Sequence, residues 1–168
     1  QLRFLTMGLN VAVFVPEGIV LSSDSLAFLR QDDEGFEASS KRTFAVWNKF
    51  IVSFVGGGFI TGKPYGCYMQ EIESKRMSIQ IDCVKDFVGY LSNFFKHIRN
   101  EDEEPLTIYV AGSSVEDSGV HHELYLIDRD SIIRLNKSNG IDDVYNYHII
   151  GRGLWINKLV LPTTFEDN

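Results

Sequence analysis

Two clusters of residues in this chain could do chemistry by residue type alone. The run His121-His122-Glu123 offers metal ligands, and Gly56-Gly57-Gly58 could hold a phosphate at a helix N-terminus. Adjacent residues of a strand point to opposite sides of the sheet, and no third ligand is spaced to join the histidines. The glycines lack a P-loop continuation, since Gly62-Lys63-Pro64 has the wrong pattern. Neither a metal nor a cofactor is therefore predicted.

Charged residues at the ends of apolar runs form a further candidate site. Asp24 closes the run that begins at Ile19, and Lys41-Arg42 opens the run that ends at Val46. An Asp before a Ser at a strand end often only satisfies the amides of a turn. A functional role for Asp24 therefore requires partners.

The elements that must position these residues follow from the apolar pattern. Strand character dominates as far as Val55, because β-branched and aromatic residues are bounded there by turn residues. An acidic loop is expected between the second and third strands, and a polar loop at 112–119. Strands are predicted at residues 8–15, 19–25, 41–46, 50–55, 106–111, 122–127, 131–135 and 145–150.

Helical patterns fill the middle of the chain. Residues 60–76 carry apolar side chains at spacings of three and four, although Gly62 and Pro64 weaken the first turn. Residues 78–99 form a clearer helix, with Ser78 as the N-cap and one wide apolar stripe that should lie on a sheet. Separate blocks of strands and helices indicate an α+β layered fold in a single domain over residues 1–168.

The composition bounds the partners and the compartment. A chain of 168 residues with 44% hydrophobic content can bury a core as one domain. The net charge of −7 argues against a nucleic acid or an anionic membrane as partner, because a polyanion would be repelled. Residues 1–7 are too short and too weakly apolar for a signal peptide. Cys67 and Cys83 lack the spacing of a zinc site, so free thiols and a cytoplasmic location are expected.

The order of the first strands resembles that of a known family. A first strand, a turn ending at Gly18, a strand closing on Asp24-Ser25, a basic strand and a strand ending on Gly56-Gly57 precede the first helix. This order is similar to that of the proteasome β-subunit and HslV peptidase family, which has the N-terminal-nucleophile (Ntn) hydrolase fold. The resemblance implies a four-layer αββα sandwich whose second helical layer is missing or incomplete here. It also implies that Gly56 and Gly57 bind a substrate backbone.

The resemblance implies a specific chemistry at the chain terminus. Peptidases of this family use an N-terminal Thr, Ser or Cys whose own α-amine is the general base, while a Lys tunes that amine and an Asp holds the Lys. A gapless alignment from Gly18 brings Asp24 onto the family's Asp but places Gly8 at the nucleophile position. If the turn at 15–17 instead holds extra residues, Thr6 aligns with the nucleophile. Both registers stay open.

The remaining site positions depart from the family's pattern. Arg42 stands at the Lys position, and a guanidinium is charged at any accessible pH. Arg152 stands where the family has a supporting Ser, and Thr6 has residues before it that keep its nitrogen in an amide. If the site is inactive, Arg42 should form an ion pair with Asp24, because the carboxylate would otherwise lack a counter-charge.

The sequence therefore favours a non-peptidase, proteasome β-subunit-like protein that self-associates or joins related subunits. One alternative is an active threonine peptidase that uses Thr6 after processing, with Asp24 and Arg42 in its site and a peptide or protein as substrate. Another is an unrelated α+β binding module. In a family-like fold, both helices should cover one outer face of two stacked antiparallel sheets.

Overall fold

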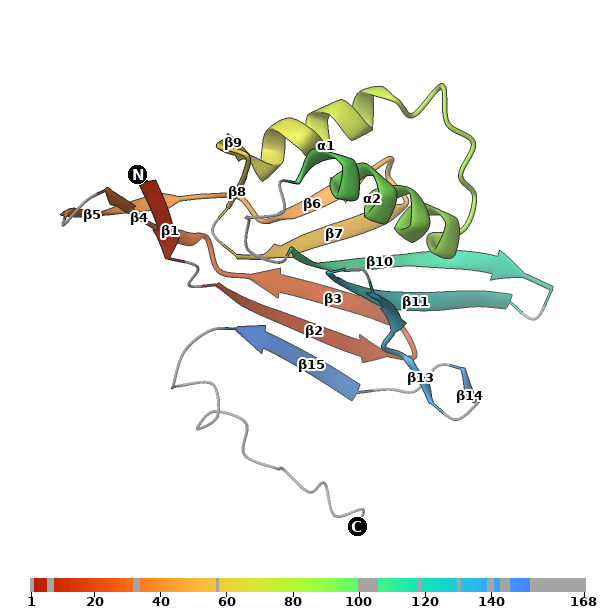
Figure 1. Ribbon diagram of the computed structural model, residues 1–168. Coiled ribbons are helices and arrows are strands. Elements are labelled where there is room, and N and C mark those ends of the chain that lie inside the picture. The colour runs from red at the N-terminus through yellow and green to blue at the C-terminus, as the bar shows by residue number, and fades with distance from the viewer. Residues whose placement is uncertain are drawn as a thin grey trace, which may run out of the picture.

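The structure is a computed structural model that describes residues 2–5, 8–31, 34–56, 58–99, 106–117, 119–129, 131–138, 141–142 and 146–151 (Figure 1). The helices in these ranges are α1 (Tyr65–Ser74) and α2 (Val84–Ile98). The strands before α1 are β1 (Leu2–Leu5), β2 (Leu9–Val15), β3 (Gly18–Ser23), β4 (Leu26–Gln31), β5 (Glu34–Ser39), β6 (Thr43–Val46), β7 (Phe50–Val55), β8 (Phe59–Ile60) and β9 (Lys63–Pro64). The strands after α2 are β10 (Thr107–Glu116), β11 (Gly119–Asp128), β12 (Ser131–Arg134), β13 (Lys137–Ser138), β14 (Ile141–Asp142) and β15 (Asn146–Gly151).

These elements form three layers (Figure 1). A five-stranded antiparallel sheet with the order β12-β11-β10-β7-β6 lies in the middle. Both helices pack on one of its faces, and a three-stranded antiparallel sheet with the order β15-β2-β3 covers the other. The chain is thus a mixed α+β protein of antiparallel sheets. The prediction that both helices cover one outer face of two stacked sheets is confirmed.

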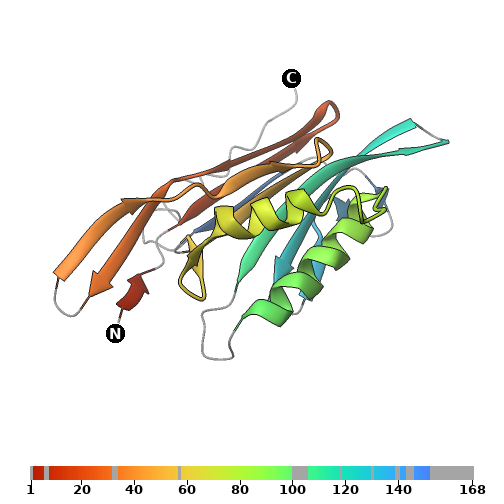
Figure 2. The same cartoon turned by 90° about the horizontal axis from the view of Figure 1, so that it is seen from above.

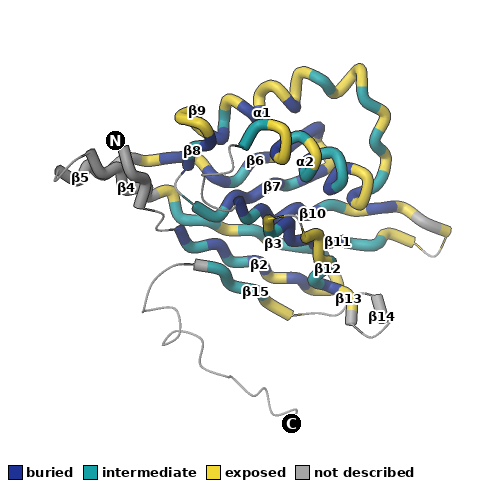
Figure 3. Tube along the Cα trace, viewed as in Figure 1, coloured by how far each residue is buried: buried dark blue, intermediate teal, exposed yellow. Residues whose placement is uncertain are grey.

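The central sheet buries side chains on both faces. Phe54 of β7 points toward the helices, where its ring stacks on that of Tyr65 with centroids 4.3 Å apart, whereas Ile51 points toward the three-stranded sheet. Phe50 stacks on Phe87 of α2 with ring centroids 4.1 Å apart. Because both faces are covered, the β7 sequence is almost continuously apolar. Buried residues accordingly concentrate in the central layer (Figure 3).

A second core lies between the two sheets. Ala12 and Phe14 of β2 pack there in one cluster with Tyr109 of β10 and Leu124 of β11. The Tyr109 hydroxyl is 2.6 Å from Nδ1 of His148 on β15. This contact ties the edge strand of the three-stranded sheet to the central sheet.

The predicted start of the first helix is wrong. Residues 59–64 form the short hairpin β8–β9, and α1 begins only at Tyr65. Thr61 and Gly62 in the turn of this hairpin have positive φ values of 47° and 76°, which a helix does not accommodate. The turn signal of the glycine therefore outweighs the apolar spacing at this end.

The predicted N-cap of the second helix, Ser78, is also wrong. Cys83 occupies that position, and its Sγ accepts a hydrogen bond from the Asp86 amide at 3.4 Å. Val84, the first helical residue, lies against the sheet at Gly112, where a Cβ would come within 2.9 Å of the Val84 Cγ2. The helix α2 therefore begins where Gly112, which has no side chain, lets Val84 lie close to the sheet.

Two segments predicted as loops are strands. The acidic stretch between β3 and β6 forms the hairpin β4–β5, which projects at one end of the molecule and pairs with β1 (Figure 2). The predicted polar loop at 112–119 largely continues β10 and β11, which stay paired from Thr107↔Asp128 to Glu116↔Gly119. Asp32 and Asp33 lie outside the described ranges.

The outer face of the three-stranded sheet is apolar and open. Val13 is 38% exposed, and it lies between Val20, which is 62% exposed, and Tyr147, which is 46% exposed, on the neighbouring strands. Both described helices pack on the opposite side of the molecule (Figure 1). Within the part of the chain that the structure describes, no helix is both long and apolar enough to cross a membrane.

Candidate functional site

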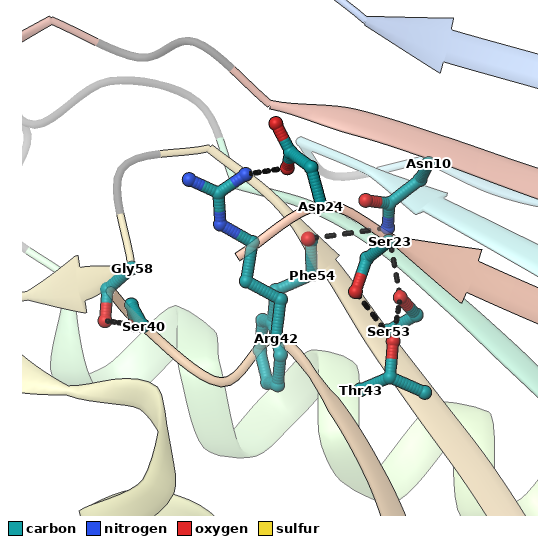
Figure 4. Close-up of polar contacts among 9 residues, drawn as sticks. All are labelled: Asn10, Ser23, Asp24, Ser40, Arg42, Thr43, Ser53, Phe54 and Gly58. Carbon is teal, nitrogen blue, oxygen red and sulfur yellow. Dashed lines mark hydrogen bonds and ion pairs between the residues drawn. The ribbon is translucent and has the colours of Figure 1, made fainter. Parts of the chain in front are cut away.

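The candidate site forms where strand ends of the two sheets meet (Figure 4). Asp24 follows β3, and its amide donates to the Leu9 carbonyl of β2 at 3.0 Å. Arg42 precedes β6, and its carbonyl accepts from the Phe54 amide of β7 at 2.9 Å. Backbone hydrogen bonds thus hold the main chain of Asp24 beside the three-stranded sheet and the main chain of Arg42 beside the five-stranded sheet.

Arg42 and Asp24 form an ion pair, as predicted from the sequence. The Arg42 Nη1 donates to the Asp24 Oδ1 (Figure 4). Arg42 is 1% exposed, whereas the Asp24 side chain keeps 37% of its surface exposed. A buried guanidinium cannot discharge by losing a proton, so it requires a counter-charge in place. Asp24 supplies that charge from the rim of the site.

Gly8 lies directly against this ion pair. A Cβ at position 8 would come within 2.7 Å of the Arg42 Nη1 and 3.2 Å of the Gly56 amide nitrogen. Real Cβ atoms do not approach other heavy atoms as closely as the first of these distances. The guanidinium therefore occupies the space that a side chain at position 8 would need.

A chain of buried and half-buried polar side chains continues from this point between the sheets (Figure 4). Ser23 Oγ lies 2.8 Å from Thr43 Oγ1, which lies 2.8 Å from Ser53 Oγ. The Asn10 Nδ2 donates to the Ser53 Oγ at 2.8 Å and to the Phe54 carbonyl at 3.1 Å. These contacts join β2 and β3 to β6 and β7, so they stabilise the stacking of the two sheets next to the ion pair.

Sequence reasoning did not identify this polar chain, although a signal existed. Asn10 interrupts the apolar strand β2, and Ser53 interrupts the apolar strand β7. Both side chains are buried, at 1% and 0% exposure. Polar residues at inward positions of apolar strands are usually hydrogen-bonded to one another or to the backbone. The Asn10 Oδ1 is buried without a hydrogen-bond partner among the described atoms.

The glycines after β7 bring a second backbone segment to the site. The Gly58 carbonyl accepts from the Ser40 Oγ at 3.4 Å and from the Tyr65 amide at 3.0 Å. A Cβ at Gly58, whose φ is 92°, would come within 2.4 Å of the Ser40 Oγ. Only glycine fits this close approach, so the glycine run is needed for packing as well as for conformation.

The described charged side chains at the site are paired with each other. Among the side chains drawn in Figure 4, the cation is Arg42 and the carboxylate is Asp24, and the Arg42 Nη1 donates to the Asp24 Oδ1. Ser53 is fully buried, so it is closed to a substrate. The described arrangement pairs Arg42 with Asp24 and joins the two sheets through side-chain hydrogen bonds.

Several predicted site residues lie outside the described ranges. They are Thr6, Gly57 and Arg152. Asp24, Arg42 and Gly56 lie together around Gly8. His122 bonds through Nδ1 to the Ser113 Oγ at 2.8 Å. The described residues contain no group of three His, Cys, Asp or Glu side chains able to hold a metal ion.

Comparison with known proteins adds no family to this geometry. No family model matches the chain, and no curated protein is significantly similar to it.

Proposed function

We propose that this protein is a proteasome β-subunit-like member of the Ntn-hydrolase fold that has lost peptidase chemistry and acts in assembly. The observation that carries the proposal is the position of Arg42. Its guanidinium lies in the space of a side chain at position 8 and binds Asp24. A nucleophilic side chain at position 8 would have to displace this guanidinium, which Asp24 holds in place.

The three layers support the same proposal. Two stacked antiparallel sheets with both helices on one side correspond to three layers of the four-layer αββα sandwich that the sequence resemblance implies. The proximity of position 8 to Asp24, Arg42 and Gly56 favours the register in which Gly8, rather than Thr6, stands at the nucleophile position.

The open face of the three-stranded sheet supports an assembly role. We name it the outer sheet face, and it consists of Val11, Val13, Val15, Val20, Tyr147 and Ile149. These residues carry no charge, although the chain has a net charge of −7. Two copies repel each other least where they present neutral surface, and apolar area favours association there. Self-association, or association with a related subunit, therefore centres on this face.

Active-site labelling tests the loss of peptidase chemistry. The full-length protein is incubated with a peptide epoxyketone, which forms a covalent adduct with an N-terminal Thr, and its intact mass is measured. We expect no adduct, because Gly8 at the nucleophile position has no side chain to attack the inhibitor. A known proteasome β-subunit serves as the positive control for the inhibitor. Stoichiometric labelling at Thr6 would contradict the proposal and establish the threonine peptidase alternative.

A further inference from the structure

The two helices enclose a groove on the side of the molecule away from the ion pair. α1 and α2 lie next to each other above the central sheet (Figure 2), and the groove between them has a volume of about 650 Å³. This volume falls within the usual range for pockets that hold small molecules, about 300 to 1,000 Å³. We name it the interhelical groove, and its side chains include Lys63, Tyr68, Glu71, Lys75, Tyr90 and Phe94.

Aromatic rings form the apolar part of the interhelical groove. Phe94 lies between Tyr68 and Tyr90, with ring centroids 6.5 Å and 6.1 Å away. Such spacings leave edges and faces of neighbouring rings available to a further ring, which prefers offset or edge-to-face contact. The groove is therefore suited to an aromatic group rather than to a polar one.

Positive charge lies beside these rings. The Lys75 Nζ is 5.2 Å from the Phe94 ring centroid and 2.7 Å from the Glu71 Oε1. An ammonium group has three N–H donors, so Lys75 can bind a second oxygen without releasing Glu71. Lys63 adds another cation to the lining of the groove. The two lysines carry two positive charges against the one negative charge of Glu71, although the whole chain has a net charge of −7.

A hydroxyl in the groove lacks a partner. The Tyr90 hydroxyl oxygen is buried and has no hydrogen-bond partner among the described residues. Buried hydroxyl groups are normally hydrogen-bonded, since an unsatisfied donor costs free energy. An anionic oxygen that reached this hydroxyl would accept its hydrogen bond and remove that cost.

We propose that the interhelical groove binds a small ligand that joins an aromatic ring to an anionic oxygen group. The ring packs against Tyr68, Tyr90 and Phe94, while the anionic group contacts Lys75 and the Tyr90 hydroxyl. The site is separate from Arg42 and Asp24, and it does not depend on the proposed assembly role.

Binding of 8-anilino-1-naphthalenesulfonate to the full-length protein tests this site, with affinity measured by fluorescence and calorimetry. Tyr90→Phe removes only the hydroxyl, and Lys75→Gln removes only the charge. Each should weaken binding about tenfold, the usual effect of losing a hydrogen bond to a charged group. The control Tyr147→Phe makes the same change on the outer sheet face and should leave the affinity unchanged.

A neutral dye with the same rings, N-phenyl-1-naphthylamine, separates the apolar from the anionic part of the proposal. We expect it to bind at least tenfold more weakly than the sulfonate and to be insensitive to Lys75→Gln. Equal affinity for the two dyes would overturn the proposal, as would wild-type affinity in both groove variants. Loss of binding in a Val13→Lys variant with retention in Tyr90→Phe would assign the dye to the outer sheet face instead.

Discussion

Among single residues, the proposed loss of peptidase chemistry depends most on the contact between Gly8 and Arg42. Because Gly8 has no side chain, the Arg42 guanidinium can lie buried next to it and beside Asp24. The ion pair was predicted for an inactive site, because the resemblance places Arg42 at the family's Lys position and Asp24 at its Asp position. The sequence could not predict the close approach of Gly8, because that depends on how the two sheets stack.

A side chain at position 8 should destabilise the protein. Gly8→Ala places a Cβ 2.7 Å from the Arg42 Nη1, and overpacking of this kind costs about 1–3 kcal/mol in the free energy of unfolding. Urea denaturation measures the change. Gly89→Ala is the matched control, because a Cβ there meets no atom within 4 Å. Gly89 lies inside α2, where alanine should stabilise by about 0.5–1 kcal/mol. Equal stability of the two variants would contradict the described contact.

Removal of the Asp24 charge should be costly. Asp24→Asn removes the charge that Asp24 contributes to the buried guanidinium of Arg42, and breaking an ion pair costs about 3–5 kcal/mol when both partners are buried. The 37% exposure of Asp24 lets water replace part of the interaction, which places the expected loss at the lower end. Asp82→Asn is the control, because the Asp82 side chain is 95% exposed and pairs with Lys49 at 3.4 Å. A loss no greater than in this control would argue against a structural ion pair.

At the element scale, the hairpins were more predictable than the helix ends. β2–β3 and β6–β7 follow the predicted pairing, because each combines an apolar run with a tight turn. The hairpin β4–β5 was missed, since its acidic residues resemble a solvated loop. The start of α2 was missed because it depends on the space above Gly112, which a local pattern does not contain.

The edge strand β15 should make stability depend on pH through His148. Burial lowers the pKa of His148, so the unfolded chain binds a proton at a higher pH than the folded chain does. Its contribution to stability is complete above a pH of about 6.5, the unfolded value, and is lost as the pH falls toward the folded pKa. Urea unfolding between pH 5 and 8 should show this decrease.

His148→Asn should reduce that pH dependence. The Asn Oδ1 can take the place of Nδ1 as partner of the Tyr109 hydroxyl, and it does not titrate. His97→Asn is the control, because His97 is exposed on α2 and far in sequence from the sheet contact. An unchanged pH profile in His148→Asn, with a flattened one in His97→Asn, would show that the effect comes from elsewhere.

At the scale of the whole molecule, the three layers leave the outer sheet face uncovered by the described helices. Its central row runs from Tyr147 through Val13 to Val20 across the strands. The sequence predicted stacked sheets and an apolar face in need of a cover. It could not predict which occupant covers that face, because apolar surface alone does not specify a partner.

Association through the outer sheet face should be sensitive to one charge. In size-exclusion chromatography with light scattering, the wild-type protein should exceed the monomer mass of 19.1 kDa. Val13→Lys should return it to that mass, because an ammonium in the centre of an apolar interface loses its hydration. Val115→Lys is the control, since Val115 is 82% exposed at the far end of β10. A folded wild-type monomer would remove the assembly role.

We expect that the protein does not generate an N-terminal nucleophile, because the Arg42 guanidinium occupies the space beside Gly8. Intact-mass and N-terminal peptide analysis of the protein purified from its own cells tests this most directly. We expect the residues before Thr6 to remain attached, so that the Thr6 nitrogen stays in an amide and cannot act as a base. A mature chain that begins at Thr6 with a free amine would contradict it.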